Sequence, residues 1–158
     1  MSKDWETYST HVDGKPASVF VDMGVADDAP LEKLTIVAWV KLRLRHPCED
    51  GTACENEQPA LQAIDDALKS GLVSKTTAHV GSLTLDGHRD FYFYTSLAQA
   101  WKERVHQALQ AFTDYQFSCG SRPDREWDLY FELLSPADED LVSIENRRQA
   151  SRSVLSTA

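Results

Sequence analysis

The sequence predicts an α+β fold in which two helices cover one face of an antiparallel sheet. Of the 158 residues, 42% are hydrophobic and 26% are charged, which is typical of an ordinary globular domain. Segments with strand-like alternation and segments with helix-like spacing follow one another as β-α-β-β-α-β. This is the order of the ferredoxin-like split unit. The sequence also predicts an N-terminal β-hairpin before this unit and an extra strand and helix after it. We expect one domain over residues 1–150 and a frayed tail at 151–158.

The first half supplies a hairpin, a strand and a helix. Residues 5–10 and 17–23 are β-branched and aromatic, and they flank a turn that contains Gly14. Thr35–Arg45 alternates strictly, which predicts a strand with a basic second face. Pro59 marks the start of a helix, for which Gly71 is the expected residue after the end. Its apolar stripe consists of Leu61, Ile64 and Leu68.

The central hairpin is predicted from Asp86-Gly87, because a two-residue type I′ turn requires positive φ at both positions. Strands at 76–85 and 88–95 then pair with a fixed register. That register places His79 opposite Tyr94 and Val80 opposite Phe93. We expect Phe91, Phe93 and Val80 to face the core.

The second half continues with a helix, two strands and a final helix. Ser96–Gln99 reads as a capping box that opens a helix through Phe112. Strands are expected at 115–119 and 127–134. A last helix begins at Ser135-Pro136, with acidic residues in its first turn, as the helix dipole favours. These acidic residues are Asp138, Glu139 and Asp140.

Five separated segments resemble a known bacterial family. They are Trp5–Tyr8, Ala17–Asp22, Leu85–Tyr94, Glu126–Glu132 and Asn146–Arg148. In this order they are similar to domain-of-unknown-function family 695. The resemblance brings no established activity or catalytic residue. It implies that members are sometimes joined to a C-terminal domain similar to regulator of ribonuclease activity B, an inhibitor-type binding protein.

Charge and cysteine content limit which partners and which cellular compartment are expected. The chain carries 25 Asp and Glu against 16 Lys and Arg, a net charge of -9, which opposes general attraction to nucleic acid or anionic lipid. No apolar stretch is long enough for a membrane helix, and the start lacks a secretory signal pattern. Three cysteines cannot all pair within the chain, so a reducing compartment, the cytoplasm, is expected.

The residues that could bind a metal or take part in catalysis all have simpler structural explanations. His46, Cys48, Cys54 and Cys119 could ligate zinc, but no closely spaced Cys pair is present. We therefore expect surface cysteines at 48 and 54 and a half-buried strand residue at 119. A Cys48 nucleophile lacks a thiolate-favouring setting. The acid-base groups of Asp86–Asp90 diverge, because Arg89 and Asp90 point to opposite faces of one strand. We expect no catalytic residue, metal or other cofactor.

The sharper hypothesis is a binding surface on the sheet face away from the helices. In the split unit the first and third strands are neighbours, so aromatic and basic residues of both should lie together. We expect a non-catalytic binding or regulatory module that acts through protein–protein contacts or self-association. The alternative is an RNA-associated regulator that stacks bases on this face, although the net charge disfavours it. The candidate residues are Trp39, Lys41, Arg43, Tyr92 and Tyr94.

Overall fold

Six antiparallel strands form one sheet in the order β1-β2-β4-β5-β3-β6. The structure, a computed structural model, describes residues 4–136, 140, 141, 144 and 146. The N-terminal hairpin and the strand after it lie where the sequence predicts them, whereas the last strand begins two residues later and extends to Pro123. The strands are β1 (Trp5–Val12), β2 (Lys15–Asp22), β3 (Ile36–Arg43), β4 (Thr77–Leu85), β5 (His88–Thr95) and β6 (Phe117–Pro123).

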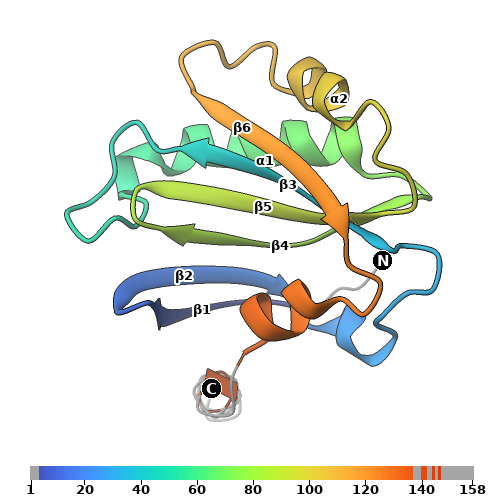
Figure 1. Ribbon diagram of the computed structural model, residues 1–158. Coiled ribbons are helices and arrows are strands. Elements are labelled where there is room, and N and C mark those ends of the chain that lie inside the picture. Colours follow the sequence, from blue (N-terminus) through green and yellow to red (C-terminus); the bar gives the residue numbers. More distant parts are fainter. Residues whose placement is uncertain (1–3, 137–139, 142–143, 145, 147–158) are drawn as a thin grey trace, which may run out of the picture.

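Both α-helices lie on the same side of the sheet (Figure 1). These are α1 (Gln58–Leu72), which follows the short helix η2 (Glu55–Glu57), and α2 (Trp101–Ala108). The predicted stripe of α1 packs with Val40 and Phe93 in a buried cluster. Gly71 lies inside α1, so the prediction that it follows the end of the helix is wrong. A Cβ at this position would come within 2.9 Å of the Ala108 Cβ. The glycine allows the two helices to approach closely.

The central hairpin confirms the predicted turn but not the full register. Asp86 and Gly87 both have positive φ, and pairing runs as expected from Leu85↔His88 to Gly81↔Tyr92. A bulge between His79 and Gly81 then places His79 opposite Phe93 and Ala78 opposite Tyr94. The prediction that Val80 faces Phe93 is therefore wrong. The extra residue reverses the alternation, so Val80 packs with Tyr94 on the other face while His79 contacts Phe91 and Phe93.

The predicted capping box at Ser96–Gln99 is not one. Helix α2 begins only at Trp101, after Ala100 with φ 62°, and Leu97 is 60% exposed. The hydroxyl of Thr95 instead accepts from the Leu97 N–H and donates to the Leu97 carbonyl. These local bonds hold the chain in a turn after β5 and delay the helix.

The extra C-terminal strand predicted at residues 127–134 is wrong, because the chain becomes helical directly after Trp127, which has φ 59°. The helical stretch includes η3 (Tyr130–Leu134). The buried residues Trp127, Tyr130 and Leu134 are spaced three and four apart. Asp124 caps the helical stretch, because its carboxylate accepts from the backbone N–H groups of Asp128 (2.9 Å) and Leu129 (3.1 Å). Most of the predicted final helix and all of the tail at 151–158 lie outside the described residues.

This C-terminal segment, residues 124–134, covers the sheet face opposite α1 and α2. The Tyr8 hydroxyl donates to the Leu134 carbonyl at 2.7 Å, and the Tyr130 hydroxyl donates to the Asp22 carbonyl at 2.6 Å. The segment appears in orange beside β1 and β2 in Figure 1. A second buried cluster therefore lies between it and the sheet. A short helix, η1 (Gly24–Asp27), lies in the connection between β2 and β3.

Candidate binding surface on the sheet

The five predicted surface residues lie on one sheet face, but only part of that face is accessible. Trp39 and Tyr92 are direct neighbours across β3 and β5, as are Val37 and Tyr94. Lys41 and Arg43 are exposed, and Trp39 is partly buried. Tyr92 is 8% exposed and Tyr94 is fully buried. Three of the five side chains are thus available to a partner.

Tyr94 is a core residue, and its assignment to an open surface is wrong. Its ring stacks on Trp127 with the centroids 3.9 Å apart. Its hydroxyl donates to the Asp124 carboxylate at 2.6 Å and accepts from the Tyr130 N–H at 3.2 Å. Burial, followed by the bond to Asp124, raises the pKa of Tyr94. The covering element is the C-terminal segment, whereas the N-terminal hairpin extends the edge of the sheet.

Trp39 lies flat against the edge strand β6. Its ring passes over Gly120, where a Cβ would come within 2.6 Å of the indole Cζ2, so only glycine fits there. Gly120, Ser118 and Arg122 are the cross-strand partners of Trp39, Lys41 and Val37, so they share their face. The accessible part, which we name the β3–β6 surface, consists of Trp39, Lys41, Arg43, Ser118 and Arg122.

Asp90 borders this surface beside Tyr92. The Tyr92 hydroxyl donates to Asp90 Oδ2 at 3.3 Å, while Asp90 Oδ1 is buried and has no hydrogen-bond partner in the part of the chain that the structure describes. Burial raises the pKa of Asp90, and the nearby charge of Lys41 opposes the shift. Lys41 is the cross-strand neighbour of Asp90. The border therefore holds a carboxylate whose hydrogen bonding is incomplete.

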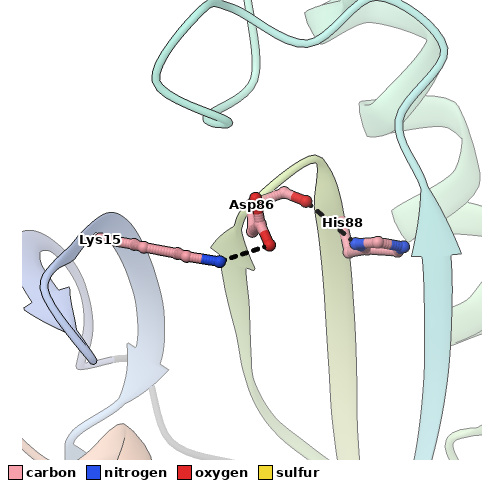
Figure 2. A network of polar contacts seen from close by, with 3 residues as sticks. All are labelled: Lys15, Asp86 and His88. Carbon is pink, nitrogen blue, oxygen red and sulfur yellow. Dashed lines mark hydrogen bonds and ion pairs between the residues drawn. The ribbon is translucent and has the colours of Figure 1, made fainter.

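The Asp86–Asp90 run does not assemble into an acid-base set. The Asp86 carboxylate pairs with Lys15 at 2.8 Å, and the His88 ring lies 3.1 Å from the Asp86 carbonyl (Figure 2). The bond to Lys15 lowers the pKa of Asp86. Arg89 turns to the opposite side, where it donates from Nε to the Thr84 hydroxyl. The divergence of Arg89 and Asp90 is as predicted.

The cysteines correct one prediction. Cys48 and Cys54 form a disulfide across six residues, so they are not independent surface thiols and cannot serve as thiolate ligands. Cys119 is free and half-buried on β6, as expected, and burial raises the pKa of its thiol. No group of three or more His, Cys, Asp or Glu side chains suited to a metal occurs in the described part of the chain. Because disulfides are rare in reducing compartments, this bond counts against the compartment inferred from the cysteine number.

The comparisons with known proteins support the family resemblance over four of its five segments, because Asn146–Arg148 lies outside the matched residues. No helix among the described residues is long and apolar enough to cross a membrane. No curated protein and no solved structure matches the chain. Residues 3–135 match the family of unknown function DUF695. This match spans most of the chain, and it contains β1 through η3 and the whole β3–β6 surface. The chain therefore belongs to the DUF695 family.

Proposed function

We propose that this protein is a non-catalytic binding module that makes protein contacts through the β3–β6 surface. The observation that carries the proposal is a tryptophan laid flat on Gly120 and bordered by exposed Lys41 and Arg43. Tryptophan and arginine dominate the binding energy of protein interfaces, because they bury large areas and form directed bonds. The C-terminal segment covers the rest of this face, which confines the contact to the β6 side.

The charge of the surface suggests the chemistry of the partner. Lys41, Arg43 and Arg122 form a basic group within a chain of net charge -9. A partner with an acidic surface would be steered to this group and repelled elsewhere. Another copy of this acidic chain meets the same description, so self-association belongs to the proposal.

The strand order supports the finer description of the fold. We propose that β3-α1-β4-β5-α2-β6 is a ferredoxin-like split unit to which β1 and β2 add two strands. Within it the first and third strands, β3 and β5, are central neighbours, and β4 and β6 flank them. The two helices follow β3 and β5 and lie on one face, as that unit requires.

Affinity capture with matched surface variants tests the function. We expect wild-type protein to retain a protein partner after nuclease treatment, and both Trp39→Ala and the double variant K41E/R43E to lose it. The double variant K75E/K102E, at exposed positions after α1 and in α2, makes the same change in charge as K41E/R43E and should retain the partner. Size-exclusion chromatography separates self-association from binding to another protein. Equal capture by all variants would contradict the proposal.

Binding of RNA is the other outcome of the same experiment. Trp39 could stack a base, with Lys41 and Arg43 near the phosphates. Loss of all capture after nuclease treatment would favour RNA over a protein partner. Release by moderate salt would accompany it, because phosphate contacts weaken as salt rises.

A further inference from the structure

A pocket of about 440 Å³ lies on the other sheet face, away from the β3–β6 surface. It is bounded by the β1–β2 hairpin, the end of the β4–β5 hairpin, the start of α1 and the disulfide loop of residues 48–54. This volume is within the range of small-molecule sites. Its lining is rich in hydroxyl groups around one cation and includes Ser9, Ser18, Thr52, Gln58, Thr84 and Arg89.

Arg89 lines this pocket with most of its hydrogen-bonding capacity unused. It is half-buried, and its hydrogen bond among the described residues is the 2.8 Å bond from Nε to the Thr84 hydroxyl. None of the ion pairs in the described part of the chain includes it. A guanidinium has five N–H donors and stays charged, so the terminal nitrogens of Arg89 call for an acceptor.

The two carboxylates whose charge acts on Arg89 are already occupied. They belong to Asp65 and Glu57. Asp65 pairs with Lys69 at 2.9 Å. The oxygens of Glu57 accept bonds from the N–H groups of Arg45 and His46 and from the Tyr115 hydroxyl. Neither carboxylate forms an ion pair with Arg89 in the part of the chain that the structure describes.

The loop that forms one wall of the pocket is held in place before any ligand binds. The disulfide between Cys48 and Cys54 closes it, and Cys48 N–H donates to the Thr52 carbonyl at 2.9 Å. Gly87 N–H donates to the Gly51 carbonyl at 2.8 Å, which joins the loop to the central hairpin. A preformed wall reduces the entropy lost on binding.

Asp50 is the acidic group in the lining. Its carboxylate accepts from both the N–H and the hydroxyl of Thr52, and these bonds lower the pKa of Asp50. It is exposed on the loop. Because its negative charge repels an anion placed beside it, the anionic group of a ligand would have to lie at the guanidinium of Arg89.

We propose that this pocket binds the oxyanion group, phosphate or carboxylate, of a small molecule at the terminal nitrogens of Arg89. The planar fork of a guanidinium matches both groups with two parallel bonds. The surrounding hydroxyls provide further donors. The site is independent of the β3–β6 surface, because Arg89 and Lys41 project from opposite faces of the sheet.

Amide NMR titration tests the proposal with two probes, inorganic phosphate and acetate, at constant ionic strength. We expect saturable shifts at Ser18, Thr84 and Arg89, and the tighter probe identifies the oxyanion class. Arg89→Gln should weaken binding of that probe at least tenfold, and Arg125→Gln, at an exposed position in the C-terminal segment on the opposite face, should leave it unchanged. Absence of saturable shifts with both probes, or equal binding by Arg89→Gln, would overturn the proposal.

A second pair of variants covers loss of folding in Arg89→Gln. Arg89→Lys keeps the charge but removes the planar fork, so we expect weaker binding of the preferred probe. Ser18→Ala removes one hydroxyl from the wall and should weaken binding severalfold. If both variants are folded and bind both probes as the wild type does, the pocket is not an oxyanion site.

Discussion

His79 should make the stability of the protein depend on pH between neutral and mildly acidic conditions. Its side chain is 8% exposed, and neither ring nitrogen has a hydrogen-bond partner among the described residues. The ring lies against Trp5 (5.3 Å between centroids) and Phe93 (4.9 Å). Burial lowers the pKa of His79 from 6.5 to about 4, while Asp65 raises it and Lys69 lowers it by smaller amounts.

The sign and size of the effect follow from proton linkage. Because the pKa is lower in the folded state, protons bind the unfolded chain more tightly as the pH falls below 6.5. Stability is therefore fully present above pH 6.5 and is lost as the pH falls toward 4. The full shift corresponds to about 3 kcal/mol, and the part expressed between pH 7 and pH 5 is about 2 kcal/mol.

Urea denaturation at pH 7 and pH 5 measures this difference, with His79→Leu as the test variant. Leucine has a similar volume and cannot be protonated, so the variant should lose about 2 kcal/mol less than the wild type on acidification. His46→Gln, at an exposed position, is the matched control and should behave as the wild type. If wild type and His79→Leu lose the same free energy, the reasoning is refuted.

Three further predictions concern the elements that close the fold. Trp127→Ala should lower the free energy of unfolding by about 3–5 kcal/mol, because the ring is fully buried on Tyr94; a change under about 1 kcal/mol in chemical denaturation would show that the C-terminal segment is not part of the core. Reduction of the Cys48–Cys54 disulfide should cost about 2 kcal/mol, the entropy expected for so short a loop, whereas a C48S/C54S variant should not respond to reductant; identical urea midpoints for the wild type with and without reductant would contradict this. Glu57→Gln should cost about 1–3 kcal/mol in the same assay, because a carboxylate that accepts three bonds becomes an amide that can accept fewer; an unchanged midpoint would show that these bonds are dispensable.

The sequence predicts local structure well where one physical signal dominates. The positive-φ turn at Asp86-Gly87 and the strict alternation of β3 are confirmed, because neither depends on distant contacts. The bulge between His79 and Gly81 has a weaker local signal, because an isolated glycine within a strand is typical either of a bulge or of a close backbone approach. Both occur here, since a Cβ at Gly81 would come within 2.8 Å of the Phe20 carbonyl oxygen. The helical C-terminal segment did have a signal. Asp124 precedes Trp127, Tyr130 and Leu134 at helical spacing, but the aromatic content favoured a strand.

The position of the candidate surface can be predicted in part for the same reason. The faces of Trp39, Lys41 and Arg43 follow from alternation alone, and the structure places them as expected. The burial of Tyr94 depends on Trp127, which lies 33 residues away in the chain. Arg89 was assigned to the correct side of β5, yet its pocket needs the hairpin, α1 and the disulfide loop together. Sequence reasoning finds the direction of a side chain more readily than what covers it.

The N-terminal hairpin presents different kinds of side chain on its two faces. Helix α1 packs over β3 and β5, so the hairpin extends the sheet beyond the helices. On the side of the C-terminal segment its residues are apolar and buried, among them Tyr8, Val19 and Val21. On the helix side the positions toward the turn are Ser9 and Ser18, which no helix covers and which line the pocket beside Arg89. Farther from the turn the same side carries Trp5 and Phe20, whose rings stack on each other. The hairpin therefore closes a core with one face, and on the other only its positions near the turn leave hydroxyl groups for the ligand that we propose.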